Sequence, residues 1–408
     1  MINTGDTAFM MICAALVFIM TPGLAFFYGG LVSRKNVLTI MMQSFISMGV
    51  VTILWFIIGF SLTFGPDVHG LIGGLKYMFL HGVGMEANPD YGSTIPFMSF
   101  FSYQQMFAIL TPALITGAFA DRVNFKSYLV FLVLWSLLIY IPLAHWVWGG
   151  GFLQEMGAID FAGGTVVHVN AGISALVMAI MLGQREDYRI GHPITPHNIT
   201  FVFLGTSFLW LGWFGFNAGS GLAADGLAAN AFMVTHIATA VAAVTWMAID
   251  WICNKKPTTV GACTGAVAGL VAITPAAGTV DLLGAFFIGL ITPIVCFFMV
   301  AVVKPKFKYD DALDAFGVHG IGGIVGSILT GVFATQYITG EGGQQGALYG
   351  DWHQLWIQIF ATLVSIVFSA IITFILYKVV DSWIGIRVSR RVEEEGLDIY
   401  EHGESAYN

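Results

Sequence analysis

Charged residues are scarce in this chain, whereas long apolar runs are frequent. Of its 408 residues 10% are charged and 57% are hydrophobic, and the mean hydropathy is +0.80. An ordinary soluble domain carries about 25% charged residues, so the composition excludes that class and indicates a polytopic membrane protein. The formal net charge of -8 also argues against nucleic acid as a partner.

Cysteine is nearly absent, and catalytic signatures are missing. The four cysteines lie in apolar runs without metal or redox spacing, which predicts small core residues and no metal site or cofactor. No set of nucleophile, base and orienting group is recognisable, so an enzyme is the least expected class. The first six residues lack a basic region, and we therefore expect no cleaved signal peptide.

The apolar runs predict an all-α membrane protein with eleven transmembrane helices, since about 20 residues suffice to cross the hydrocarbon core. The expected spans start near Ala8, Leu38, Pro96, Ser127, Gly164, Ile199, Leu227, Val260, Asp281, Ala315 and Trp352. Of the 16 Lys and Arg residues, only Lys76 falls outside one alternating set of loops and the C-terminal region. The positive-inside rule then predicts a cytoplasmic C-terminus and an external N-terminus.

Two histidines lie inside predicted spans, in related surroundings. His168 stands eight residues after Asp160, and His319 stands eight residues after Asp311. An ionisable group within a span is costly, which favours a role in lining a pathway. Eleven spans divide into five, five and one, and odd-numbered repeats have opposite orientations. This inverted 5+5 repeat plus a final helix predicts that the histidines lie in series, with His168 nearer the outside.

The predicted pathway is apolar rather than charged. A bare cation would lose its hydration there, whereas a small neutral molecule needs only one or two hydrogen bonds. Tyr103, Phe107 and Trp148 offer aromatic faces to a cation at the external end. Asp160 has two possible roles: it accepts a proton, or it caps the backbone N-H groups of the glycines that follow.

Two other histidines, His236 and His145, are expected to have structural roles. We expect His236, which lacks a partner motif, to be a hydrogen-bonded core residue. His145 is expected at the membrane interface.

Several motifs closely resemble the signatures of the ammonium transporter family (Amt, Mep and Rh proteins), and most closely a bacterial Amt. They are Asp160-Phe-Ala-Gly-Gly-Thr-Val-Val-His-Val-Asn-Ala-Gly172, Trp213-Phe-Gly-Phe-Asn-Ala-Gly-Ser220, Phe26-Phe-Tyr-Gly-Gly-Leu31 and Phe316-Gly-Val-His-Gly-Ile-Gly-Gly323. The resemblance covers the whole chain. It implies a homotrimer of eleven-helix protomers in the bacterial cytoplasmic (inner) membrane, each with its own pore for ammonium, ammonia or methylammonium.

The resemblance also implies roles for individual residues. NH4+ would be recruited by Tyr103, Phe107, Trp148 and Ser220, and the gate below that site would be formed by Phe107 and Phe216. The pore would be lined by His168, His319 and Trp213. Asp160 would stabilise the cation or cap the loop. Many relatives have phenylalanine at the position of Tyr103. Deprotonation of NH4+ at the gate would exclude potassium, which has no proton to lose. Net transport of NH3 and electrogenic transport remain alternatives.

The chain divides into a transmembrane transporter domain, residues 1–380, and a polar cytoplasmic tail, residues 381–408. Composition alone predicts a disordered acidic tail, but the family resemblance implies an ordered one that couples protomers and a PII-type signal protein as partner. Two alternatives are a proton-coupled metabolite carrier, which should have a roomier polar site, and an ammonium sensor, which usually carries a fused cytoplasmic domain.

Overall fold

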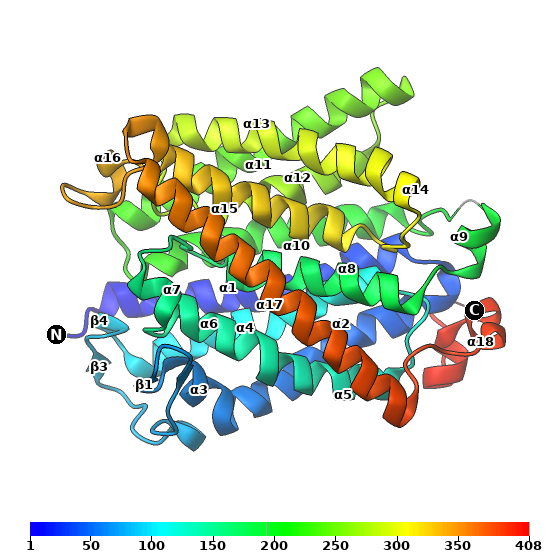
Figure 1. Cartoon of the computed structure of the whole chain (residues 1–408), viewed down its shortest axis with the longest axis horizontal. Helices are drawn as coiled ribbons and strands as arrows, with labels where there is room; N and C mark the ends of the chain where they lie inside the picture. The colour runs from blue at the N-terminus through cyan, green and yellow to red at the C-terminus, as the bar shows by residue number, and fades with distance from the viewer. Residues whose placement is uncertain (193, 408) are drawn as a thin grey trace.

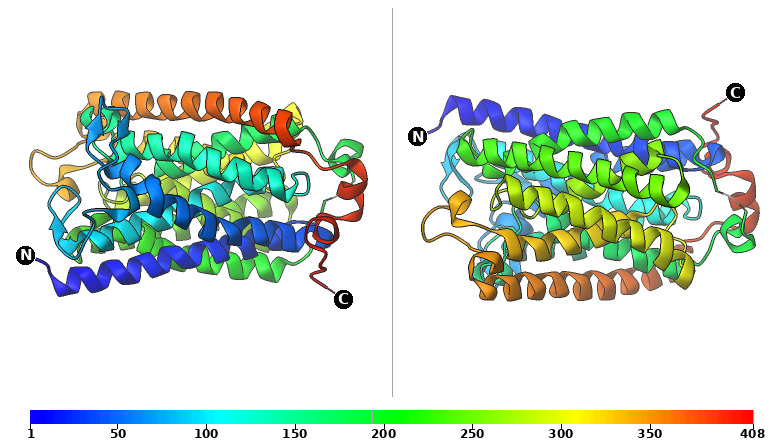
Figure 2. Two further views of the ribbon diagram at one scale, coloured as in Figure 1. Left: turned by 90° about the horizontal axis from the view of Figure 1, so that it is seen from below. Right: turned by 90° about the horizontal axis from the view of Figure 1, so that it is seen from above.

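The computed structural model describes residues 1–192 and 194–407. Long helices run side by side along the longest axis of the molecule, and the two termini lie at opposite ends (Figures 1 and 2). The helices are α1 (Thr4–Leu31), α2 (Val37–Leu54), α3 (Phe60–Phe64), α4 (Phe97–Phe119), α5 (Phe125–Trp135), α6 (Ile141–Trp148), α7 (Phe152–Glu155), α8 (Asn170–Leu182), α9 (Glu186–Ile190), α10 (Ile199–Ala218), α11 (Gly226–Asn254), α12 (Thr259–Ile273), α13 (Leu282–Phe298), α14 (Lys304–Phe307), α15 (Ile321–Phe333), α16 (Gln336–Thr339), α17 (Trp352–Ile384) and α18 (Arg390–Glu395).

Short strands occur only in the first long loop of the described chain. β1 (Asp67–Val68) pairs with β2 (Ile72–Gly73), and β3 (Ala87–Asn88) pairs with β4 (Gly92–Pro96), each in antiparallel register. Both hairpins lie at the end of the bundle that carries the N-terminus (Figure 1). They place the loop over the bundle, and Ile95 of β4 is fully buried in the core.

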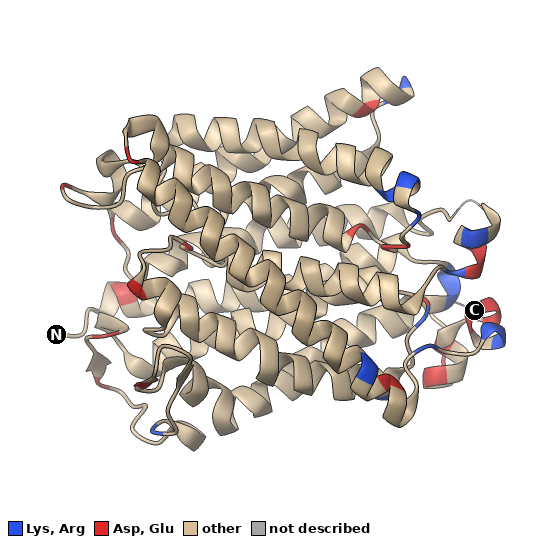
Figure 3. Cartoon of the chain, in the orientation of Figure 1, with Lys and Arg blue, Asp and Glu red and all other residues tan. Residues whose placement is uncertain are grey.

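The fold is that of a multi-pass helical membrane protein. Within the described residues, nine helical segments are long and apolar enough to cross a membrane. Two further helices, α4 and the shorter α12, run beside them, so a helical segment begins within four residues of each predicted start. Lys and Arg gather at the end that carries the C-terminus, and acidic residues predominate at the other (Figure 3).

Both predicted histidine spans begin with a π-helical turn, in which the backbone accommodates one extra residue. These turns are η5 (Gly164–Val169), which leads into α8, and η8 (Phe316–Gly320), which leads into α15. α8 packs against η8, and α15 packs against η5. This reciprocal crossing brings the two histidines together at the centre of the bundle.

The last long helix, α17, lies along the outside of the bundle (Figure 2) and presents polar side chains to the segment that carries His168. The Gln358 amide bonds to both the N-H and the C=O of Ile159, at 2.7 Å each. Further along the helix, Ser369 donates to the Asn170 side chain at 2.8 Å. Because these buried polar groups are satisfied only when α17 is docked, they fix the position of η5 and α8.

The C-terminal tail is ordered in the described residues, in contrast to what its composition predicts. α17 continues past the predicted boundary as far as Ile384, and the chain then forms α18 and a π-helical turn, η10 (Asp398–His402). The Asp398 carboxylate accepts hydrogen bonds from the N-H groups of Leu38 (2.9 Å) and Thr39 (2.8 Å). Asp398 thereby satisfies unpaired N-H groups at the start of α2 and anchors the tail to the bundle.

His145 is fully buried inside the protein, with Nδ1 2.7 Å from the Thr63 carbonyl oxygen and Nε2 2.9 Å from the Asp67 carboxylate, and its expected depth at the membrane interface stays a prediction. Two other structural interpretations from the sequence are wrong. His236 is exposed on the bundle surface rather than in the core, with its ring centroid 5.6 Å from that of Trp210. Cys253 is also exposed. Helical periodicity cannot settle these cases, because every face of these helices is apolar.

Candidate functional site

A series of rings crosses the centre of the bundle. Trp148 meets Phe107 edge to face, with centroids 6.0 Å apart, and Phe107 lies against Phe216 with centroids 4.2 Å apart. Phe216 in turn lies 6.1 Å from the ring of His168, whose centroid is 5.4 Å from that of His319. These five side chains come from five different helical segments, so the ring series exists only in the folded bundle.

The two imidazole rings are nearly parallel and are joined by a hydrogen bond. Their planes differ by 14°, and the Nδ1 atoms lie 3.3 Å apart, so one ring donates and the other accepts. A neutral imidazole carries one N-H, which means that one ring must present an accepting Nε2 and the other a donating Nε2-H. Among the described residues, no group bonds to Nε2 of His168. The pair can therefore offer hydrogen bonds to a small polar molecule.

Trp213 fixes the ring of His168 from one side. The two rings stack with centroids 5.3 Å apart and planes 17° apart. The indole Nε1 donates to Thr274 Oγ1 at 2.8 Å. That bond satisfies the only polar atom of the buried indole and holds it parallel to the imidazole.

A cavity of about 220 Å³ opens at the end of the bundle that carries the N-terminus, and we call it the aromatic cavity. Phe107, Trp148 and Ser220 all line it, as the sequence predicts for a recruitment site. Tyr103 does not line this cavity. Its side chain is buried, and the hydroxyl donates to the Phe216 carbonyl oxygen at 2.7 Å, so it supports the wall behind Ser220.

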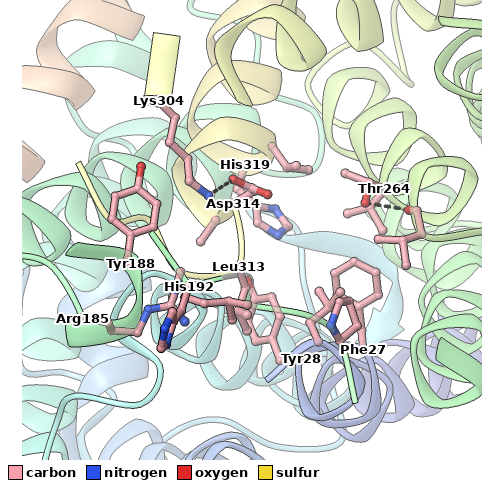
Figure 4. A pocket seen from close by; sticks show the side chains of 18 residues that line it. Phe27, Tyr28, Arg185, Tyr188, His192, Thr264, Lys304, Leu313, Asp314 and His319 are labelled. Carbon is pink, nitrogen blue, oxygen red and sulfur yellow. Dashed lines mark hydrogen bonds and ion pairs between the residues drawn. The ribbon is translucent and has the colours of Figure 1, made fainter. Parts of the chain in front are cut away.

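A second cavity, of about 350 Å³, lies at the end that carries the C-terminus, and we call it the C-side cavity (Figure 4). His319 lines it together with Tyr28 and Arg185, and the Lys304 ammonium pairs with Asp314 there at 2.6 Å. His168 is not among the residues that line this cavity. The order along the bundle is thus aromatic cavity, stacked phenyl rings, His168, His319 and C-side cavity.

Asp160 joins the aromatic cavity to the helix that carries His168. Its carboxylate accepts hydrogen bonds from the N-H groups of Gly163 (2.9 Å), Thr165 (2.8 Å) and Val166 (3.1 Å), and also from the Gly164 N-H and the Thr165 hydroxyl. Burial raises the pKa of Asp160, and these hydrogen bonds oppose that rise. The backbone C=O of Asp160 accepts from Trp148 Nε1 at 2.8 Å. The geometry is that of a helix cap.

Asp311 is a functional candidate that the sequence analysis did not include among the site residues. Its carboxylate accepts from the N-H groups of Ala315 (3.0 Å), Phe316 (2.8 Å) and Gly317 (3.2 Å), at the start of the helix that carries His319. Burial raises its pKa to about 6. The signal was present in the sequence, because Asp311 precedes His319 by the same eight residues that separate Asp160 from His168.

A buried ionic network lies next to Asp311. The sequence analysis predicted its arginines only as positive charges of the loops. Arg185 bonds to Asp310 at 2.8 Å and to Asp121 at 3.0 Å, and Arg122 lies 3.4 Å from Asp310. Burial alone would raise the pKa of Asp310, but the Arg122 and Arg185 guanidinium groups hold it below its ordinary value. This network ties the loop before η8 to the loops that follow α4 and α8.

Comparisons with known proteins agree with this geometry. Residues 8–407 match the Ammonium Transporter Family. The chain is 50% identical over 403 residues to an ammonium transporter of Bacillus subtilis, covering 99% of this chain and 98% of the relative, and 49% identical to one of Aquifex aeolicus, covering 100% and 94%. Among solved structures, Saccharomyces cerevisiae Mep2 superposes with a TM-score of 0.89 at 36% identity, covering 95% of this chain and 88% of that one. A sensor Amt protein superposes with a TM-score of 0.90 at 30% identity, covering 98% of each chain. The chain therefore belongs to the ammonium transporter family, whose members are membrane transporters and not enzymes.

Proposed function

We propose that this protein binds NH4+ in the aromatic cavity, where one N-H bond breaks and the proton passes to water on that side, and conducts the remaining NH3 past His168 and His319 to the C-side cavity. The proton then either stays on that side, which gives net transport of NH3, or crosses by a separate path, which gives electrogenic transport. The observation that supports this route is the ring series, which runs without interruption from Trp148 to His319 between the two cavities.

The aromatic cavity has the chemistry to replace part of the water around a small cation. The faces of Trp148 and Phe107 attract positive charge, which contributes about 0.5 to 2 kcal/mol per favourable contact. The Ser220 hydroxyl lies beside them, and its own hydrogen is directed to the Phe216 carbonyl oxygen at 2.9 Å. The hydroxyl oxygen, which lies 3.2 Å from the Tyr103 hydroxyl oxygen, keeps a lone pair that can accept a hydrogen bond from NH4+.

The stacked rings of Phe107 and Phe216 separate the aromatic cavity from the histidines. Both phenyl rings are buried, at 1% and 0% exposure, and offer no polar atom. A cation crossing them would lose its hydration without replacement, whereas loss of one proton leaves NH3 without a charge to bury. Beyond the gate, NH3 meets the unbonded Nε2 of His168. Potassium has no proton to lose and is rejected at the same place.

We further propose the membrane arrangement that the loop charges predict. Eleven helices cross the bacterial cytoplasmic membrane, with the aromatic cavity outside and the C-side cavity inside. The copies assemble as a homotrimer, and a PII-type signal protein binds at the cytoplasmic end, where the Lys and Arg residues gather (Figure 3). The exposed apolar side chains of α10 and α11 support contact with lipid or another copy, among them Phe203, Leu211 and Phe232.

The proposal is tested with purified protein in liposomes on a solid-supported membrane. Jumps of ammonium, methylammonium and potassium are applied to wild type, His168→Asp and His319→Asp, and the transient currents are compared with uptake of labelled methylammonium. We expect each variant either to admit potassium or to stop transport, because a carboxylate stabilises a bare cation. The matched control is His353→Asp, at an exposed position in the first turn of α17. Wild-type flux with wild-type selectivity in both pore variants would contradict the route. The same currents distinguish electrogenic transport from net movement of NH3.

A further inference from the structure

Two glycines lie at the crossing of the histidine helices, each four residues after its histidine. A Cβ atom added to Gly172 would lie 2.1 Å from the backbone nitrogen of Gly320 and 2.2 Å from its Cα. A Cβ atom added to Gly323 would lie 2.9 Å from the backbone nitrogen of Val169 and 3.0 Å from Cβ of His168. Both contacts are closer than side chains normally allow, so the absence of a side chain is what lets the helices meet.

The two contacts are reciprocal. The residue four positions after each histidine lies against the residue directly after the other histidine: Gly172 against Gly320, and Gly323 against Val169. Any separation of one helix from the other therefore moves both imidazoles apart. Small residues at a helix crossing are the usual means of close backbone approach within a membrane.

The hydrogen bond between the two imidazoles tolerates only a small increase in length. The Nδ1 atoms lie 3.3 Å apart, near the long end of the range for a hydrogen bond to nitrogen. An increase of a few tenths of an ångström would break it. Each ring would then be free to take either tautomer, and the fixed pattern of one donor and one acceptor along the pathway would be lost.

We propose that Gly172 and Gly323 are specificity-determining positions of the pathway, because they set the spacing and bonding of His168 and His319 without touching the substrate. This inference rests on the proposed route of NH3 past the histidines. It adds that the backbone crossing, and not the histidine side chains alone, determines which species passes.

The two positions differ in how much their neighbours can move. At Gly172 an added methyl group meets backbone atoms, so the helices themselves must separate. At Gly323 it also meets backbone atoms, the Gly164 carbonyl oxygen and the Val169 nitrogen, but at 2.9 Å instead of 2.1 Å, so a smaller displacement of the start of the His168 helix relieves the contact. Gly323→Ala is thus the more informative change, since it displaces His168 while leaving the bundle able to fold.

The adjacent Gly322 supplies a matched control. A Cβ atom there would lie 3.0 Å from Cγ1 of Val271, which belongs to α12 and not to a histidine helix. This crowding is milder than that at Gly323, because it involves the end of one side chain and no backbone atom closer than 3.8 Å, and it is directed away from the imidazoles. A general effect of alanine in this glycine-rich segment would appear equally in both variants.

The experiment compares wild type, Gly172→Ala, Gly323→Ala and Gly322→Ala in liposomes on a solid-supported membrane, with ammonium and potassium jumps. Cryo-electron microscopy of Gly323→Ala and Gly322→Ala measures the Nδ1 to Nδ1 distance directly. We expect Gly323→Ala to lower the ratio of ammonium to potassium current about tenfold, the upper effect of losing one buried hydrogen bond, and to lengthen the imidazole distance beyond hydrogen-bonding range. Gly322→Ala should keep both values, and Gly172→Ala, if it folds, should exceed the effect of Gly323→Ala.

The outcomes separate this inference from the proposed function. If His168→Asp and His319→Asp alter selectivity but Gly323→Ala leaves the current ratio and the imidazole distance unchanged, the glycine inference is wrong and the route stands. Equal losses in Gly322→Ala and Gly323→Ala would also overturn the inference. If the histidine variants themselves leave selectivity unchanged, the proposed route fails first.

Discussion

Asp160 and Asp311 occupy equivalent places in the two halves of the molecule. Each stands eight residues before a buried histidine, and each carboxylate accepts hydrogen bonds from consecutive backbone N-H groups where the helix with that histidine begins. Only Asp160 lies near the aromatic cavity. The comparison of the two residues therefore separates an effect on the helix from an effect on a bound cation.

The first prediction concerns these caps. Asp311→Ala should lower both the transport rate and the melting temperature, as Asp160→Ala should, because each change leaves at least three buried N-H groups without an acceptor at about 1 to 3 kcal/mol each. Initial rates of methylammonium uptake in liposomes and melting temperatures in detergent measure both effects.

The matched control for the caps is Asp281→Ala. Asp281 caps α13 through a 2.8 Å bond from the Gly284 N-H, and α13 carries none of the proposed pore residues. This variant should lose stability without losing transport rate per folded protein. An Asp311→Ala protein with wild-type uptake would show that only Asp160 matters, as expected of a carboxylate that acts on the cation or its proton.

The second prediction concerns cation recruitment. Trp148→Leu should raise the half-saturation concentration for ammonium by about threefold to thirtyfold, the equivalent of one lost cation-π contact. Concentration series of transient currents measure the change. The control is Trp146→Leu, because Trp146 packs against Phe368 at 4.5 Å and lies outside the aromatic cavity. A half-saturation concentration that is the same in wild type and Trp148→Leu would remove Trp148 from the recruitment site.

The third prediction concerns the tail. Removing the chain from Gly385 onward, which keeps α17 whole, should lower the transport rate while the trimer persists, because the start of α2 loses its acceptor at Asp398. Asp398→Ala should act in the same direction, and Glu404→Ala, at an exposed position, should not. Uptake assays and native mass spectrometry provide the two measurements. A truncated protein with the wild-type rate would refute coupling between tail and pore.

The fourth prediction is a dependence on pH. The two guanidinium groups hold the pKa of Asp310 below its ordinary value of 3.8, so the charged form stabilises the fold. This contribution is complete above pH 3.8 and is lost as pH falls through the lowered pKa. Asp310→Asn should remove that acid-dependent loss and destabilise the protein at neutral pH by about 3 to 5 kcal/mol, because Arg122 and Arg185 remain buried.

Melting temperatures between pH 2 and pH 7 test the acid-dependent loss, which is expected only below pH 3.8. Asp187→Asn serves as the control, since Asp187 is 57% exposed and its partner His192 is exposed as well. Parallel melting curves for wild type and Asp310→Asn across this range would show that the buried pair does not contribute.

Much of the helical framework could be predicted from the sequence, because apolar length is a direct consequence of the membrane. The helical segments begin at the expected residue at Gly164, Ile199 and Trp352. The two histidines could also be predicted to lie in series along one axis, since their surroundings repeat. The aromatic residues are different. Nothing in the composition distinguishes Phe216 among 34 phenylalanines, and only the family resemblance pairs it with Phe107 as a gate.

The remaining errors have a common physical origin. His236 and Cys253 both lie in α11, which is apolar on every side, so the sequence does not reveal which face packs inward. The inward face is set by contacts with helices elsewhere in the chain, such as α12 and α13. The cap by Asp311 was missed for another reason: its motif was recognised, but its carboxylate was not assigned a partner.

The π-helical turns η5 and η8 contain the two histidines, so the orientation of each imidazole depends on the number of residues in its turn. Each turn holds one more residue than a regular helix would, so deletion of a single residue within it would convert it to α-helix and change the direction of the side chains inside the turn. His168 and His319 would then point at neighbouring helices instead of at each other. A one-residue deletion in this protein can therefore be more damaging than any substitution of the rings themselves.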